Sequence, residues 1–244
     1  MEDIYEKKYK TELDLIKKYI KNDIIYDIIL KYESNVDGKI VKLRSNINVH
    51  EMVFVAILID IYKCKNTIEI GCANGVSGMV MLNQICLSSG GGSLISIDPF
   101  QTVQWSNVGK YNINRICQHH KDNNVVSKHD ILEEYSSDVL KKFIKSFNYF
   151  DCIFIDGSHA FTDVIIDIFC SIKLLKKNGI MIIDDVLHSG VKLVIDELIN
   201  FKNIQKIHLD ETDDKITIVN SSYVYKSYDK SYLNPRTMFA YVKL

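Results

Sequence analysis

Proline and glycine are scarce in this sequence, and neither sign of charge dominates it. The 244 residues include 2 prolines and 11 glycines, below the usual frequencies of about 5% and 7%. The 30 basic and 31 acidic side chains nearly cancel, which argues against nucleic-acid binding through bulk positive charge. Because 47% of the residues are hydrophobic, the chain can form a core, and disorder over most of its length is excluded.

Long hydrophobic runs and paired cysteines are also missing. The most apolar stretch, 53–62, is interrupted by Asp60 and is shorter than the ~20 residues of a membrane span. The charged N-terminus has no apolar signal-peptide segment, and the six cysteines form no C-x-x-C pair. We therefore expect reduced thiols in a cytoplasmic protein (in the host-cell cytoplasm if the source is viral), without membrane or nucleic-acid partners.

The apolar patterns predict an α/β fold. Residues 1–33 carry apolar side chains at three- and four-residue steps, which is typical of one or two amphipathic helices. From about residue 48, short apolar strands alternate with helical stretches of about 10 to 15 residues. This order predicts a Rossmann-like, doubly wound, mostly parallel seven-stranded sheet with an N-terminal helical extension. The expected strands are 67–70, 93–97, 124–127, 150–155, 180–183, 204–209 and 216–225.

Two parts of the chain are expected from this pattern. Residues 1–47 form the helical extension, which could be a cap over the site or a dimer contact, and residues 48–244 form the α/β domain. The last two strands, 204–209 and 216–225, are expected to close the chain as a hairpin-like pair. In such open sheets, ligands bind outside the carboxyl ends of the strands, so the residues after each strand are the candidates for function.

A glycine loop follows the first of these strands. Gly71 comes directly after the strand, where a glycine allows a ligand to approach the backbone closely. Gly75 precedes a helix whose first N–H groups are free to face a ligand. Ala73 stands where a G-x-G-x-x-G fingerprint has its second glycine, so the turn is poorly suited to the pyrophosphate of NAD. Asp98 ends the second strand and could accept hydrogen bonds from ribose. S-adenosylmethionine, which has an adenosine and no pyrophosphate, satisfies both observations.

Glu69, Gly71 and Gly75 with Asp98 resemble the first two motifs of the class I S-adenosylmethionine-dependent methyltransferases. The resemblance implies that Glu69 and the Gly71 loop, including Asn74, hold the methionine end of the cofactor. It covers roughly residues 48–220.

The same resemblance implies roles for three further side chains. Ser77 would meet the methionine carboxylate, Asp98 would hold the ribose, and Asp130, just past the third strand, would accept from the adenine amino group. The alternatives are a buried salt bridge for Glu69 and an ordinary helix N-cap for Asp130.

Acidic side chains end two further strands that are neighbours in such a fold. Asp156 and His159 follow the fourth strand in Asp-Gly-Ser-His, and Asp184 and Asp185 follow the fifth. Three carboxylates at one sheet edge raise one another's pKa, and a divalent cation removes that conflict. All-oxygen ligation suits Mg²⁺. The alternative is a simple turn at Asp156 and a solvated loop at Asp184 and Asp185.

This second group resembles the metal-dependent O-methyltransferases of the catechol and caffeoyl-CoA kind, and more closely the enzymes that methylate macrolide sugars. The resemblance implies metal binding by Asp156, Asp184 and Asp185, with His159 as general base. An imidazole titrates near pH 6.5 and can accept a proton at neutral pH. His188 is a weaker alternative as base or substrate contact.

The expected function is therefore S-adenosylmethionine-dependent, Mg-dependent O-methylation of a hydroxyl on a sugar or related vicinal diol. The acceptor is expected to be a small molecule or a glycan, and the protein could be a homodimer. Alternatives are a metal-independent methyltransferase acting on protein or RNA, a non-catalytic scaffold that binds S-adenosylmethionine, and, least favoured because of Ala73, an NAD oxidoreductase.

Overall fold

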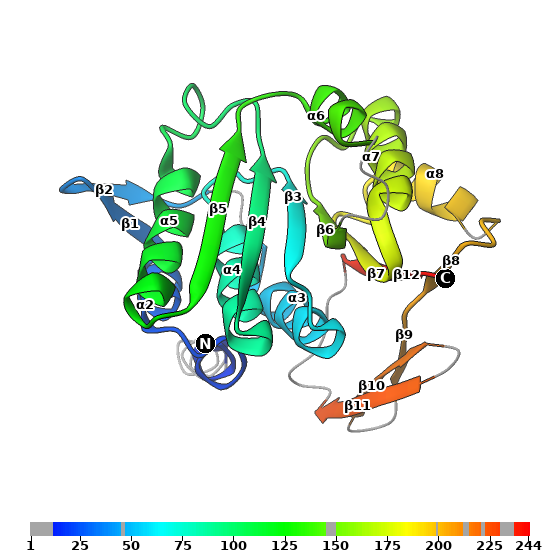
Figure 1. The fold of residues 1–244 in the computed structure, drawn as a ribbon, viewed down its shortest axis with the longest axis horizontal. Coiled ribbons are helices and arrows are strands. Elements are labelled where there is room, and N and C mark those ends of the chain that lie inside the picture. Colours follow the sequence, from blue (N-terminus) through cyan, green and yellow to red (C-terminus); the bar gives the residue numbers. More distant parts are fainter. Residues whose placement is uncertain are drawn as a thin grey trace, which may run out of the picture.

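The computed structural model describes residues 12–44, 47–144, 150–198, 200–211, 215–220, 223–229 and 237–244. Its centre is a seven-stranded sheet with helices on both faces (Figure 1). In spatial order the strands are β5 (Val126–Leu132), β4 (Gly91–Ile97), β3 (Asn66–Ile70), β6 (Phe150–Ile155), β7 (Leu175–Ile183), β12 (Phe239–Lys243) and β8 (Ile204–Lys206). The first five run parallel, whereas β12 is antiparallel to both of its neighbours. The predicted fold class is confirmed.

Helices connect the parallel strands and cover the two faces of the sheet. They are α3 (Val49–Tyr62), α4 (Val76–Ser89), α5 (Val108–Asp122), α6 (Ser136–Phe143), α7 (Phe161–Leu174) and α8 (Ser189–Leu198). Strand side chains alternate between the faces. On β6, Cys152 and Phe154 join the core beneath α3, α4 and α5, while Ile153 and Ile155 join the core beneath α6, α7 and α8. The continuous apolar runs of the central strands follow from this two-sided burial.

The strand order places the switch point of the sheet between β3 and β6. From β3 the chain moves outward through β4 to β5, then crosses back to β6 on the other side of β3. Loops that leave the carboxyl ends of β3 and β6 therefore diverge in opposite directions, which leaves a crevice between them. The Gly71 loop follows β3 and Asp156 follows β6, so both predicted motifs lie at this crevice.

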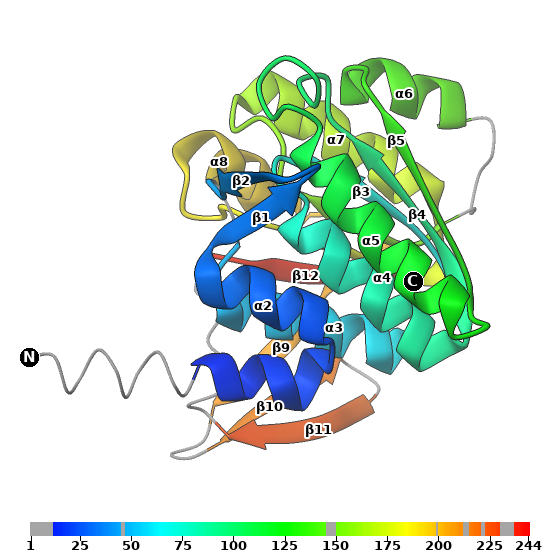
Figure 2. The same ribbon diagram turned by 90° about the vertical axis from the view of Figure 1, so that its left-hand side faces the viewer.

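The N-terminal segment packs against the α3 and α4 side of the sheet (Figure 2). A π-helical turn, η1 (Ile16–Ile20), leads to α2 (Asp23–Lys31) and to a hairpin of β1 (Glu33–Val36) and β2 (Lys39–Lys42). Apolar side chains from 13 to 29 share one core with α3 and α4. Asn48 caps α3 in a capping box with Glu51. The proposed division at residue 47 therefore runs through a continuous hydrophobic core.

The closing strands differ from the prediction. The segment 204–209 divides into β8, at the edge of the central sheet, and the start of β9 (His208–Glu211). The segment 216–225 contributes to β10 (Lys215–Asn220) and β11 (Tyr223–Asp229), which with β9 form a separate antiparallel sheet (Figure 1). The seventh central strand is instead β12, which pairs with β7 and β8 and leaves no place there for residues 216–225.

Two expectations from composition can be compared with the described residues. All six cysteines are free thiols, and five of them are buried, so the structure contains no disulfide framework. Within the described ranges, no helix is long and apolar enough to cross a bilayer.

Candidate active site

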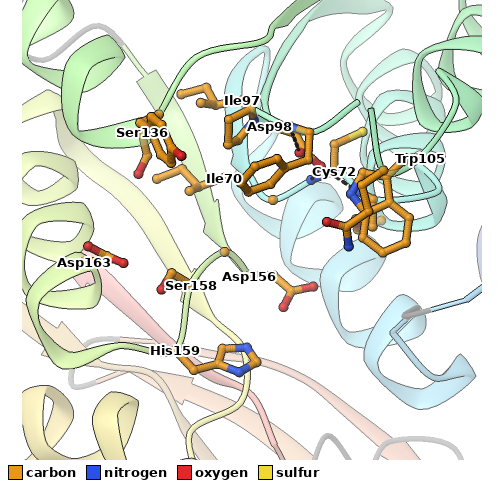
Figure 3. Close-up of a pocket in the computed structure, with 18 of the residues that line it drawn as sticks. Ile70, Cys72, Ile97, Asp98, Trp105, Ser136, Asp156, Ser158, His159 and Asp163 are labelled. Atoms are coloured by element: carbon orange, nitrogen blue, oxygen red, sulfur yellow. Dashed lines mark hydrogen bonds between the residues drawn. The ribbon is translucent and has the colours of Figure 1, made fainter. Parts of the chain in front are cut away.

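A cavity of about 530 Å³ opens at the switch point of the sheet. Its walls include the Gly71 loop after β3, Asp98 and Trp105 after β4, and Asp156 and His159 after β6. Figure 3 shows Cys72, Asp98 and Trp105 in one part of this pocket and Asp156 with His159 in another. The glycine loop and the acidic segment, predicted separately, therefore line one cavity.

Gly71 brings these two segments together. Its φ of +86° lies in the left-handed region, and a Cβ at this position would lie 2.0 Å from the backbone oxygen of Asp156. Since no side chain fits there, only glycine permits this approach of the two loops. The amide of Asp156 donates to the carbonyl oxygen of Ile70 at 2.8 Å, which fixes the same junction.

Glu69 lies behind the loop and is completely buried. Its carboxylate accepts hydrogen bonds from the hydroxyls of Ser77 and Ser96. Burial raises the pKa of Glu69 from 4.5 to about 7, and the two serine hydrogen bonds oppose the rise. Glu69 does not line the pocket, whereas Ser77 does. This placement matches the alternative of a buried structural partner, whereas Ser77, whose hydroxyl donates to Glu69, belongs to the pocket wall.

Replacement of Glu69 by Gln is expected to change how stability depends on pH. A carboxyl whose pKa is higher in the folded state stabilises the fold below pH 4.5, and this contribution is lost as the pH rises towards 7. The loss is on the order of 3 kcal/mol at about 1.4 kcal/mol per pH unit. Urea unfolding from pH 4.5 to 8 should show a shallower decline for Glu69→Gln, with exposed Glu134→Gln as control. Parallel curves for the variant and the natural protein would contradict this account.

Asp98 is buried and its carboxylate already binds the loop. Oδ2 accepts from the amides of Cys72 at 3.2 Å and Ala73 at 2.8 Å, and from Nε2 of Gln101 at 3.0 Å. Oδ1 accepts from the amide of Phe100 at 2.9 Å. Asp98 also lines the pocket, which is compatible with the predicted contact to a ribose; that contact stays a prediction. Its observed contacts show that it also holds the glycine loop in place.

Asn74 and Gly75 are the loop residues that do not line the pocket. The side-chain oxygen of Asn74 accepts from the amide of Arg44 at 2.6 Å, and its carbonyl oxygen accepts from Asn112 at 3.0 Å. The Asn112 side chain in turn accepts from Ser34 on β1 at 2.5 Å. Asn74 thus ties the loop to the N-terminal segment, and direct cofactor contact is not what its geometry favours.

Asp130 lies inside β5, where the sequence placed it just past the strand. The strand begins at Val126 and runs to Leu132, because the segment 128–132 pairs with β4 along its length. The Asp130 carboxylate is half exposed, lies 3.0 Å from Lys128, and does not line the pocket. The predicted adenine contact is therefore misplaced. β5 ends at Leu132, and the residues that follow it, Tyr135 and Ser136, line the pocket. The apolar pair Ile131-Leu132 could have indicated in the sequence that the strand continues this far.

Three potential metal-binding side chains converge after β6 and β7. Ligand atoms of Asp156, His159 and Asp185 all lie within 4.8 Å of one another. Nε2 of His159 is 2.8 Å from a carboxylate oxygen of Asp185, and the rings of His159 and His188 are 4.7 Å apart between centroids. The sequence prediction that these segments meet at one edge is confirmed.

The electrostatics of this cluster are unfavourable without a cation. Burial raises the pKa of Asp156 well above 3.8, and the negative charges of Asp184 and Asp185 raise it further. Burial, followed by the charge of Glu51, raises the pKa of Asp184 to about 7. Among the described residues, no lysine or arginine forms an ion pair with Asp156 or Asp184.

Asp184 differs from the prediction because it lies outside the three-residue cluster. Its Oδ1 accepts from the amide of Asp185 at 2.7 Å and lies 3.0 Å from the hydroxyl of Thr237. That hydroxyl also binds Glu51 of α3. Sequence reasoning missed Glu51, since nothing local shows that it faces the strand ends. Asp184 and Glu51 thus form a layer of acids behind Asp156 and Asp185.

The donor set fits a hard divalent cation. Two carboxylates and one imidazole lie close together and are half-buried. Desolvation, and then the nearby negative charges, raise the pKa of the Asp156 carboxyl, and such oxygen donors suit Mg²⁺ or Mn²⁺. The same groups could also form an acid–base pair, because His159 contacts Asp185 directly. Both possibilities concern the same end of the cavity.

One family model matches the central part of the chain. Residues 68–186, 119 of the 244, match a family model described as a methyltransferase domain. This span begins in β3 and ends just after Asp185, so it contains the glycine loop and the whole three-residue cluster. A search of curated proteins gives no match.

Solved structures share the fold over nearly the whole chain. An O-methyltransferase from Bacillus cereus, in complex with S-adenosylhomocysteine, has a TM-score of 0.60 at 16% identity, covering 94% of this chain and 95% of that one. A proposed O-methyltransferase from Klebsiella pneumoniae has a TM-score of 0.62 at 17% identity, covering 96% of both chains. A proposed caffeoyl-CoA O-methyltransferase from Staphylococcus aureus has a TM-score of 0.61 at 17% identity, covering 97% and 99%. Residues 68–186 therefore match a methyltransferase domain, and the chain has the fold of solved S-adenosylmethionine-dependent O-methyltransferases.

Proposed function

We propose that the protein transfers the methyl group of S-adenosylmethionine to a hydroxyl of a vicinal diol, with a divalent cation bound beside the acceptor. The observation that carries this proposal is the single cavity, which joins the glycine loop to the cluster of Asp156, His159 and Asp185. A methyl donor and an acceptor must meet in one enclosed space, because in-line transfer requires the reacting atoms to be in near contact.

The cofactor would lie along the glycine loop. Gly71 and Ser77 line the cavity, and Ser77 lies in the first turn of α4, where free N–H groups favour a carboxylate such as that of the methionine end. Asp98 lines the next part of the wall and would face the ribose. Phe100 and Tyr135, whose rings pack edge to face at 6.1 Å, provide an aromatic wall suited to a purine.

Asp156 and Asp185 are the residues proposed to hold the cation. They supply oxygen donors from two adjacent loops, and the buried layer of Asp184 and Glu51 adds negative charge behind them. A bound Mg²⁺ would lower the pKa of a hydroxyl that it contacts. Asp184 is proposed to orient the loop through the Asp185 amide rather than to bind the metal directly.

His159 is proposed to remove the proton of the acceptor hydroxyl. In a neutral imidazole, the Nε2 that lies 2.8 Å from Asp185 would carry the hydrogen, which leaves Nδ1 as the acceptor. The acceptor oxygen then forms a bond to the methyl carbon as the carbon–sulfur bond breaks, so the products are a methyl ether and S-adenosylhomocysteine. The hydroxyl proton remains on His159 until solvent takes it.

The function is tested by transfer of a labelled methyl group to a panel of acceptors. Sugars with neighbouring hydroxyls and catechols are offered in parallel, with monohydroxy analogues as matched controls. We expect transfer to a diol that falls at least hundredfold in EDTA and returns with Mg²⁺. Undiminished transfer in EDTA would contradict the role of the metal. Protein and RNA are offered in separate reactions, and transfer to these alone would contradict the diol as acceptor.

Sugar-like acceptors are favoured within this panel because Ser158, beside His159, and Asp163, in the first turn of α7, both line the cavity (Figure 3). Their polar groups can bind the further hydroxyls of a sugar, which a flat apolar wall cannot do. We also propose that the protein acts in the cytoplasm. The N-terminal segment is proposed to cover the site or to form a dimer contact.

A further inference from the structure

Ala73 has a backbone conformation that its side chain disfavours. Its φ is 45°, in the left-handed region, where a residue with a Cβ is strained. It occupies the position in the loop where a dinucleotide fingerprint has its second glycine. Glycine adopts this conformation without steric cost, so in this chain something else must hold residue 73 in place.

Two buried side chains bind both polar groups of Ala73. Its amide donates to Oδ2 of Asp98 at 2.8 Å, and its carbonyl oxygen accepts from Nε2 of Gln101 at 2.8 Å. Nε2 of Gln101 also donates to Oδ2 of Asp98 at 3.0 Å, so the two side chains brace each other. Gln101 is completely buried and Asp98 is 4% exposed.

A third segment fixes Gln101 from the other side. Oε1 of Gln101 accepts from the amide of Lys110 in α5 at 3.4 Å. Gly109 packs directly against this arrangement, since a Cβ there would lie 2.5 Å from the Ala73 carbonyl oxygen and 2.9 Å from Oε1 of Gln101. The Gln101 amide thus links the glycine loop, the end of β4 and the start of α5, with no atom facing solvent.

From these contacts we infer that Gln101 is a positioning residue, which together with Asp98 holds Ala73 in the left-handed conformation and so sets the shape of the cofactor loop. In this chain, hydrogen bonds with Asp98 and Gln101 stabilise a backbone conformation that a glycine would adopt without steric cost. The inference rests on the proposed function only in taking the ligand of the loop to be S-adenosylmethionine. The loop conformation itself can be measured without any ligand.

A double-mutant cycle between Gln101 and Ala73 tests the inference. Gln101→Leu and Ala73→Gly are made singly and together, and hydrogen exchange of the loop amides of Cys72 and Ala73 is followed in the ligand-free protein. We expect Gln101→Leu to speed exchange at least tenfold when residue 73 is alanine, and less than threefold when it is glycine. Equal acceleration in both backgrounds, or none in either, would overturn the inference.

Two further variants keep the result interpretable. Gln101→Asn retains the amide but is one methylene too short, so it should behave as Gln101→Leu does, and it serves if the leucine variant does not fold. Gln118→Leu, an exposed change on α5 outside these contacts, should leave the exchange of the loop unaltered.

Calorimetry with S-adenosylhomocysteine separates this inference from the proposed function. If the natural protein binds the ligand, Gln101→Leu should weaken binding at least tenfold, and added Ala73→Gly should restore most of the affinity. If the natural protein does not bind it, the proposed cofactor fails, while the exchange measurement still decides whether Gln101 acts through Ala73.

Discussion

Replacement of Asp156 by Asn should lower methyl transfer by about 10³-fold or more, because a cation that is no longer held cannot lower the pKa of the acceptor hydroxyl. The same change should not destabilise the metal-free protein at pH 8. Partial burial and the negative charges of Asp184 and Asp185 raise the pKa of Asp156, so replacing its carboxylate by a neutral amide removes a repulsion. The expected combination is lost activity and lost Mn²⁺ binding with unchanged or increased thermal stability.

The measurements are initial rates with saturating S-adenosylmethionine, Mn²⁺ binding by calorimetry, and thermal unfolding with and without Mn²⁺. Asp138→Asn, an exposed change on α6, is the matched control. A variant that keeps Mn²⁺ affinity, or that loses activity only because it unfolds, would show that Asp156 is not the centre of a metal site.

His159→Ala is expected to give the second large effect, a fall in kcat of about 10² to 10⁴, the range of a lost general base. Mn²⁺ binding should persist in this variant, because the proposal assigns the cation to Asp156 and Asp185. The two expectations together separate a base from a ligand. The cluster geometry alone does not separate them, since His159 lies among the three groups that could hold a metal.

His188→Ala is the comparison for this experiment, since its ring lies beside that of His159 and it has the same chemistry. We expect a loss at least tenfold smaller than that of His159→Ala. Loss of Mn²⁺ affinity in His159→Ala would make His159 a metal ligand, and an equal or greater loss of rate in His188→Ala would move the role of base to His188.

Most of the fold could be predicted because the local sequence pattern indicates each of the central strands and helices. β6 and the second half of β7 are short apolar runs beside helical segments, as burial on both faces of the sheet requires. The strand at 150–155 was predicted with the bounds found in the structure. The pairing of β12 could not be predicted, because an antiparallel strand from the end of the chain enters the sheet through contacts distant in sequence.

The site residues that could be predicted are those that directly follow a strand, because the end of the strand fixes their position. Gly71 and Asp156 each follow a strand directly, so strand order alone brings them together. Asp130 was misplaced because its strand is longer than the apolar run that marks it. Gln101 and Glu51 carry no local signal, since their roles arise from contacts between separate segments.

The chemistry of Glu69 shows the limit of a motif. The spacing to Gly71 placed it correctly at the end of β3, but the side on which its carboxylate lies depends on Ser77 and Ser96. Packing decides whether a motif residue binds a ligand or supports the residues that bind it. The spacing of the motif does not show how its side chains pack.

One crystallographic measurement tests the central claim that a cofactor site and a metal site share one cavity. Crystals soaked with S-adenosylhomocysteine and MnCl₂ would be recorded at a wavelength where manganese scatters anomalously. The account predicts ligand density along the Gly71 loop and an anomalous peak between the carboxylates of Asp156 and Asp185. Bound S-adenosylhomocysteine with no peak at these carboxylates, or a peak with no ligand at the loop, would contradict it.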